Sequence, residues 1–120
     1  MHGIMQIFTD RTQAALEIGL TGEAQRQRVT SNNIANVNTP GFTAQKVDFE
    51  GSLARALRNR DGGPVSIAHS AGEPWMSLNG NKVSLENETT TLVKSNLHYE
   101  AIVNAVNGRF GLLGTAIGVR

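Results

Sequence analysis

The sequence has no cysteine and few aromatic residues. Without cysteine, the chain can form neither a disulfide framework nor a thiolate metal site. Its aromatic residues are four Phe, one Trp and one Tyr, which make up 5% of the 120 residues. Because large rings usually fill much of the core of a globular domain, this composition indicates one domain with a small core.

Net charge and long apolar stretches are also lacking. The formal net charge is +1, which gives no electrostatic basis for binding nucleic acid or an anionic membrane surface. The longest apolar stretch, Phe110 to Val119, contains glycines and is well short of the roughly 20 residues that span a bilayer. The N-terminal residues MHGIMQIFTDRT lack the basic start, apolar core and cleavage site of a secretory signal. We therefore expect any export of the protein to proceed without a cleaved secretory signal.

A long helical pattern is present at the start of the chain. No proline interrupts residues 5–37, which predicts one helix over that range. The proline after Thr39 pushes this residue out of the helical region. Pro40 and Gly41 then fit the second and third positions of a type II turn, so we expect the turn from Thr39 to Phe42 to end the helix.

The middle of the chain, residues 43–82, has a different character. It contains two of the three prolines, several glycines and a basic cluster. Residues 53–57 predict a turn or two of helix. The dipeptide Asn79-Gly80 is typical of a tight turn, and it predicts a short hairpin between residues 75–78 and 82–83. We expect this middle segment to be extended, flexible and poor in core residues.

The last part of the chain predicts a second long helix. Ser84 fits the N-cap position, and Glu86 and Glu88 lie in the first turn, where the helix dipole favours acidic residues. The residues that follow recur at alternating spacings of four and three, which is typical of a coiled-coil seam. One row of this seam is Leu85, Leu92, Tyr99, Val106 and Leu113, and the other is Thr89, Asn96, Val103, Phe110 and Ile117.

The predicted fold class is therefore mainly α. Long N-terminal and C-terminal helices are expected to pair as an antiparallel coiled-coil layer, with a short irregular or β-hairpin middle segment. Residues 1–42 and 83–120 are expected to form the helical core domain, and residues 43–82 the flexible segment between them.

Each predicted helix carries two apolar stripes. The first helix has Ile18 and Val29 on one face and Leu16 on another, and the last helix has Leu97 and Leu112 opposite its seam. Two helices bury only one stripe each against one another, and leaving a Leu or Ile exposed forfeits roughly 1.5–3 kcal/mol. We expect other subunits to bury the second stripes, because the middle segment is too polar and broken to cover them. The alternative is that the stripes are ordinary variation in a helical hairpin.

These patterns predict a subunit interface along both helices. The asparagines near the end of the first helix can each donate and accept hydrogen bonds, so they could fix the register between neighbouring helices or, alternatively, cap the helix end. The predicted interface residues are Ile18, Val29, Asn32, Asn33, Asn36, Leu92, Tyr99, Val103, Val106, Phe110, Leu113 and Ile117.

The stretch from Gln27 to Phe42, QRVTSNNIANVNTPGF, resembles the N-terminal signature of flagellar axial proteins, the family of rod, hook and hook-associated proteins. Asparagine-rich helix ends that lead into Thr-Pro-Gly-Phe are unusual elsewhere. Within that family, the short middle segment and the lead-in NGNKVSLENE at residues 79–88 are similar to proximal rod proteins. The resemblance covers nearly the whole chain, and residues 51–74 contribute least.

The resemblance implies a structural subunit of the proximal rod in the bacterial flagellar basal body. Proteins of this kind are exported unfolded by the flagellar type III apparatus, polymerise helically and transmit torque across the periplasm. The implied partners are copies of the chain, the rod proteins FlgC, FlgF and FlgG, the adaptor FliE, the membrane ring protein FliF and, in transit, the export gate. In other subunits of this kind the gate reads a Phe followed four residues later by an apolar residue. Phe49 and Leu53 fit that spacing.

Other functions remain as alternatives at this point. A sister rod subunit, FlgC-like or FlgF-like, shares the signature, and a generic helical self-assembly module shares the two stripes. An enzyme is disfavoured because His98 has only Glu100 nearby and no phosphate loop or His-Glu-x-x-His motif is present, so we expect no catalytic, cofactor or metal site. A DNA-binding module is disfavoured because the chain is not basic and lacks a short recognition helix behind a tight turn.

Overall fold

The computed structural model describes residues 2–58, 75–78, 82–116 and 118, with side chains described for these residues apart from 2–10, 113 and 116. The elements in chain order are α1 (His2–Ala35), β1 (Gln45–Val47), α2 (Glu50–Arg58), β2 (Met76–Leu78) and α3 (Leu85–Ala116). The fold is mainly helical, with two long helices and a short two-stranded sheet between them in sequence, as predicted.

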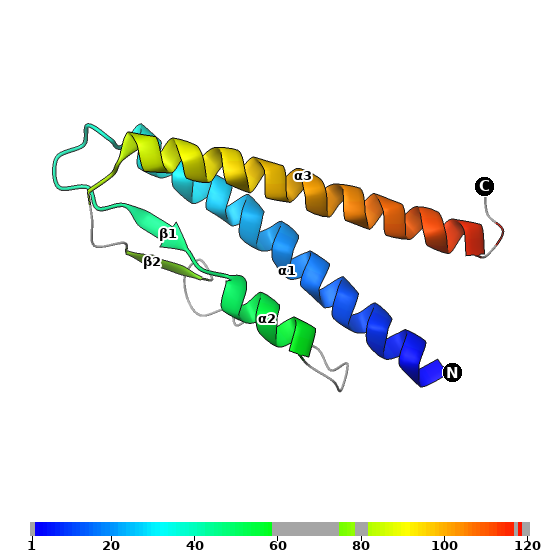
Figure 1. Ribbon diagram of the computed structural model, residues 1–120. Coiled ribbons are helices and arrows are strands. Elements are labelled where there is room, and N and C mark those ends of the chain that lie inside the picture. Colours follow the sequence, from blue (N-terminus) through cyan, green and yellow to red (C-terminus); the bar gives the residue numbers. More distant parts are fainter. Residues whose placement is uncertain (1, 59–74, 79–81, 117, 119–120) are drawn as a thin grey trace.

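The long helices run antiparallel, and α1 is the element around which the others pack (Figure 1). α3 lies along one side of α1, while α2 and β1 contact α1 as well. The free ends of α1 and α3 lie at the same end of the molecule (Figure 1). Among the described residues, no helix combines the length and the apolar character needed to cross a bilayer.

The end of α1 lies two residues earlier than predicted, and a turn follows it. The backbone N–H of Phe42 donates to the carbonyl of Thr39 at 3.2 Å. Gly41 has φ +76°, the left-handed conformation that a type II turn needs at its third position and that glycine adopts without steric cost. The side chain of Asn36 donates to the carbonyl of Asn32 at 2.8 Å and occupies the end of the helix.

The start of α3 confirms Ser84 as the N-cap. Its hydroxyl oxygen accepts a hydrogen bond from the backbone N–H of Asn87 at 3.4 Å, and its carbonyl accepts one from the N–H of Glu88 at 2.9 Å. The first of these bonds pairs a backbone donor that the first turn of a helix leaves without a partner, and the second is the first regular bond of the helix.

The two strands pair with each other, and this corrects the predicted hairpin. β1 and β2 are antiparallel, with Gln45 opposite Leu78 and Val47 opposite Met76. The prediction that residues 82–83 supply the partner strand is wrong, and Asn79 and Gly80 lie outside the described residues. β1 is a better partner for β2 than residues 82–83, because buried Val47 holds β1 in place against α1. The backbone edge of β1 that faces away from α1 remains open for pairing with β2.

The hydrophobic core lies between α1 and the middle segment. It consists of Ile18 and Val29 from α1 together with Val47, Phe49 and Ala56, and Leu53, Trp75 and Met76 pack against it. The expectation that the middle segment is poor in core residues and cannot cover α1 is therefore wrong. The average polarity of this segment conceals an amphipathic α2 whose apolar face fits α1.

A glycine in α1 makes that fit possible. A Cβ atom added at Gly22 would lie 2.3 Å from the ring of Phe49. Only a residue without a side chain lets the ring approach the helix backbone this closely. Gly22 therefore forms a notch that receives Phe49.

The face of α3 that packs on α1 differs in part from the predicted seam. Residues at heptad spacing make the contacts: Glu88 bonds Asn33, Ser95 bonds the carbonyl of Glu23, Ile102 lies over Gly19, and Arg109 bonds Gln13. The predicted row Leu92, Tyr99 and Val106 alternates with them and is half-buried.

The other predicted row was wrong for Thr89, Asn96 and Phe110, which are exposed. Val103 is half-buried, and Ile117 lies outside the described residues. In the first row, Leu85 is exposed, and the side chain of Leu113 is not described. The error has a physical cause, because the true second row contains a carboxylate and a hydroxyl. These polar groups pack inside because α1 supplies hydrogen-bonding partners for them.

Candidate assembly surface

The predicted interface residues of α1 fall into two groups. Ile18, Val29 and Asn33 are buried within the chain, with 1%, 7% and 1% of their surface exposed. In this arrangement their contacts are with the same chain, and their predicted role in a subunit interface stays a prediction. Asn32 is exposed and Asn36 is half-buried at the helix end, where both remain accessible to a neighbour.

Asn33 joins three elements at one point. Its amide nitrogen donates to the carbonyl of Gln45 at 2.8 Å and to the carboxylate of Glu88 at 3.0 Å. Its amide oxygen accepts the backbone N–H of Gln45 at 3.0 Å. The side chain therefore fixes the start of β1 and the first turn of α3 against the end of α1, which makes it a register-setting residue inside the chain.

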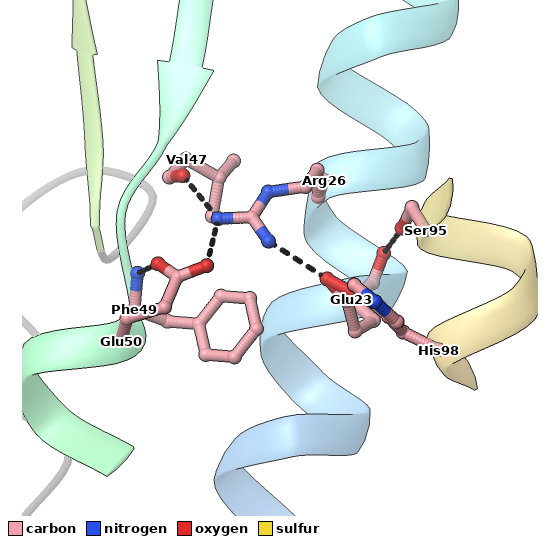
Figure 2. Close-up of polar contacts among 7 residues, drawn as sticks. All are labelled: Glu23, Arg26, Val47, Phe49, Glu50, Ser95 and His98. Carbon is pink, nitrogen blue, oxygen red and sulfur yellow. Dashed lines mark hydrogen bonds and ion pairs between the residues drawn. The ribbon is translucent and has the colours of Figure 1, made fainter. Parts of the chain in front are cut away.

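A second polar contact joins the middle of the two long helices. Glu23 is 1% exposed, and its carbonyl accepts the hydroxyl of Ser95 at 3.1 Å. Nδ1 of His98 lies 3.1 Å from its carboxylate (Figure 2). The carboxylate of Glu23 is buried, and a buried carboxylate needs hydrogen-bonding partners because leaving it unpaired is costly.

Arg26 connects α1 with the middle segment. Its guanidinium donates to Glu23 at 2.8 Å, to the carbonyl of Val47 at 2.7 Å and to Glu50 at 2.6 Å (Figure 2). The same group lies 4.6 Å from the ring centre of Phe49, which is a cation–π contact. One side chain thus holds the first turn of α2 over the Gly22 notch.

The pKa of Glu50 reflects this contact. Partial burial by itself raises the pKa, but the hydrogen bond from Arg26, backbone N–H donors and the positive charge of Arg26 outweigh it, so the pKa of Glu50 is lowered. The carboxylate also accepts the N–H of Phe49 at 3.1 Å. Glu50 is therefore held in its charged form at the N-terminus of α2, where the helix dipole favours a negative charge.

The contacts around Glu23 and Arg26 are structural in kind. Within the described part of the chain, no three His, Cys, Asp or Glu residues come close enough to hold a metal ion. His98, the predicted solvent-facing histidine, is 64% exposed at its side chain and contacts Glu23 rather than Glu100. What the arrangement does is hold three helices in fixed register.

Large apolar side chains remain exposed on α3. At least half of the surface of each of five residues is accessible, with fractions of 52% to 74%: Leu85, Val93, Leu97, Phe110 and Leu112. We call these five residues the α3 apolar surface. Burying such a side chain fully against a partner contributes roughly 1.5–3 kcal/mol, so contact with a neighbour at these residues would favour association.

Open grooves flank the packed helices. On one side, a groove of about 330 Å³ is lined by Gly19, Leu53, Ala101 and Ile102, and a second of about 560 Å³ by Leu16, Ala105 and Leu112, among other residues. On another side, Gln27, Asn32, Asn96 and Tyr99 are among the residues that line a groove of about 960 Å³. Asn32 and Tyr99, both predicted interface residues, are thus brought together at one surface.

Sequence reasoning missed Glu23, Arg26, Ser95 and His98. All four are polar, and the hydrogen bonds that join Glu23 to Ser95 and His98 connect residues 72 and 75 positions apart. A heptad count that admits polar residues finds Glu88, Ser95 and Arg109 in one row. That count was the signal in the sequence that could have placed Ser95 at the contact with α1.

Comparisons with known proteins agree with the resemblance carried by the signature at the end of α1. A family described as "Flagella basal body rod protein" matches residues 14–43. The flagellar basal body rod protein FlgB of Bacillus subtilis (strain 168) is 29% identical over 126 residues, covering 94% of this chain and 97% of that protein. FlgB of Escherichia coli (strain K12) is 31% identical, covering 83% of this chain and 90% of that protein. FlgB of Salmonella typhimurium (strain LT2) is 30% identical, covering 76% and 83%.

Proposed function

This chain belongs to the FlgB family of flagellar basal body rod proteins, and on that premise we propose that it is a structural subunit that polymerises helically in the proximal rod. A rod is an open helical polymer, so its contacts join one patch of a subunit to a different patch on the next. The polymer carries torque between the motor and the distal structures and lies in the periplasm. A mechanical subunit of this kind needs no catalytic chemistry.

The α3 apolar surface is the observation that carries the proposal. α1 is packed on two sides within the chain, whereas Leu97, Phe110 and Leu112 have 60%, 59% and 74% of their surface exposed. A neighbouring subunit that covers these residues removes their apolar area from water, which favours association. The predicted interface residues that are accessible enough to take part in such contacts are Asn32, Asn36, Leu92, Tyr99, Val103, Val106 and Phe110.

The proposed partners are those expected of a subunit at the base of the rod. They are further copies of this chain, the rod proteins FlgC, FlgF and FlgG, the adaptor FliE and the membrane ring protein FliF. The chain is proposed to reach them unfolded through the flagellar type III export apparatus, with Phe49 and Leu53 contacting the export gate during transit.

Phe110→Asp tests assembly separately from folding. Because Phe110 is largely exposed, the substitution should leave the free energy of unfolding within about 0.5 kcal/mol of the wild type. It places a charge where a neighbour would bury an apolar ring, so the variant should be made and exported but absent from purified rods. Asn107→Asp adds the same charge at an exposed position of α3 and serves as the matched control. Normal rods containing Phe110→Asp would remove this residue from the interface.

A further inference from the structure

The residues proposed for export recognition are largely covered in the folded chain. Phe49 is 4% exposed and Leu53 is half-buried, and both pack with the core between α1 and α2. The N–H of Leu53 donates to the carbonyl of Phe49 at 3.0 Å, so the pair lies on adjacent turns of one helical segment. Their shared face is turned towards α1.

Three groups enclose the ring of Phe49. The Gly22 notch lies beneath it, the guanidinium of Arg26 lies 4.6 Å from its centre, and the ring of Trp75 lies 6.1 Å away at an interplanar angle of 55°. Trp75 is itself held by a hydrogen bond from its indole N–H to the hydroxyl of Ser52 at 3.0 Å. Phe49 and Leu53 both line the open groove of about 330 Å³, but with 4% of its surface exposed Phe49 offers a receptor almost no contact area while its segment stays packed on α1.

We infer that the docking of Phe49 into the Gly22 notch is an autoinhibitory contact, which hides the export-recognition pair in the folded chain. The inference rests on the proposed role of Phe49 and Leu53 in export. Its new element is that recognition by the gate and packing on α1 compete for the same ring. A chain that has folded is thereby withdrawn from export, and a chain that has not folded remains readable.

Competition of this kind has a quantitative consequence. When only a fraction of the molecules is in the binding-competent state, the apparent dissociation constant rises by the inverse of that fraction. Opening the notch should therefore tighten binding to the gate without any change in the residues that the gate contacts. The effect of Gly22 on binding is the signature that distinguishes competition from direct contact.

Gly22→Ala is the variant that opens the notch. Its added Cβ would overlap the ring of Phe49, at 2.3 to 2.6 Å from three ring atoms, while Phe49 and Leu53 themselves remain. Alanine is a stronger helix former than glycine, so α1 is retained. Gly108→Ala, where no atom lies within 4 Å of the added Cβ, is the matched control in α3.

Two measurements on the full-length chain test the inference. Trp75 is the only tryptophan, and a red shift of its fluorescence reports that the middle segment has left α1. Binding to a purified cytosolic domain of the export gate is measured by titration. We expect Gly22→Ala to shift the fluorescence and to bind at least about tenfold more tightly than the wild type, with Gly108→Ala unchanged in both. Adding Phe49→Ala to Gly22→Ala should abolish the gain.

The outcomes separate this inference from the proposed export role. If Gly22→Ala shifts the fluorescence but binds no more tightly, while Phe49→Ala weakens binding, the gate does read Phe49 and the autoinhibition is refuted. If Phe49→Ala has no effect on binding in either background, the recognition role itself fails, and the inference fails with it.

A second variant guards against misfolding of Gly22→Ala. Arg26→Ala removes the cation–π contact and the hydrogen bonds to Val47 and Glu50 without adding any atom to the notch. It should loosen the same segment and tighten gate binding in the same direction by a smaller factor. Circular dichroism checks that the long helices persist in both variants, and unchanged binding by a helical, fluorescence-shifted Arg26→Ala chain would also refute the inference.

Discussion

The two long helices have similar lengths, 34 residues in α1 and 32 in α3, but different surroundings. α1 contacts α3 and is also covered by β1 and α2. α3 packs on α1 along one side and leaves the five residues of the α3 apolar surface exposed. Both helices carry two apolar stripes in sequence, so a second stripe does not by itself indicate a subunit contact. A second stripe is left for a subunit contact only if the chain contains no segment whose shape fits it.

The strongest test of this difference compares two phenylalanines. Phe49 covers α1 and is 4% exposed, whereas Phe110 belongs to α3 and is 59% exposed. Phe49→Ala should lower the free energy of unfolding by about 3–5 kcal/mol, because it removes a buried ring and leaves a cavity. Phe110→Ala should change it by less than about 0.5 kcal/mol. Urea unfolding of the two variants measures both values, and equal losses would mean that the two helices are covered alike.

Two neighbouring asparagines give a smaller effect that sharpens the same contrast. Asn33→Ala leaves the backbone of Gln45 and the carboxylate of Glu88 without their bonds, which should cost about 1–3 kcal/mol. Asn32 is exposed, so Asn32→Ala should have little effect on stability. Thermal unfolding compares them directly. If Asn32→Ala were the more destabilising change, Asn33 would not be the residue that ties α1 to its neighbours.

The smallest expected effect concerns pH and the cover of α1. The pKa of Glu50 is lowered in the folded chain. A lowered folded-state pKa means that the charged form stabilises the fold above the unfolded value of about 4.3, and that this stabilisation is lost as pH falls through the lower folded value. Between pH 7 and pH 3, the melting temperature of Glu50→Gln should therefore fall slightly less than that of the wild type. Added salt should reduce the difference, because Glu50 is largely solvent-exposed.

A wild type and a Glu50→Gln variant with parallel profiles would show that Arg26 holds the middle segment through Val47 and Phe49 rather than through the carboxylate. That result would weaken the electrostatic account of the α1 cover and leave its apolar account intact.

Much of the architecture follows from local signals in the sequence. Prolines and glycine mark the turn after α1, Ser84 marks the start of α3, and apolar spacing predicts two long helices. These features depend on residues that are close together in the chain. A strand at residues 76–78 was also expected from a turn signal, but the partner strand expected for it was wrong.

The errors arose where tertiary partners decide. The second row of the α3 seam contains Glu88 and Ser95, which apolar counting skips, and they pack inside only because Asn33 and Glu23 receive them. Likewise, nothing local to Phe49 shows that a glycine 27 positions earlier forms a notch for its ring. The interface residues that remain accessible are still predictions, because they depend on molecules outside the chain.

The partners of α1 also differ in how far away they are along the sequence. Arg26 reaches Glu50, 24 positions later, whereas Gln13 meets Arg109, 96 positions later. A chain that is synthesised N-terminus first therefore contains α1 and its cover of β1 and α2 well before it contains α3. Contacts between distant positions form slowly because a long loop must close first. The packing of α3 on α1 is therefore the last part of the fold to be completed, because it needs the final residues of the chain.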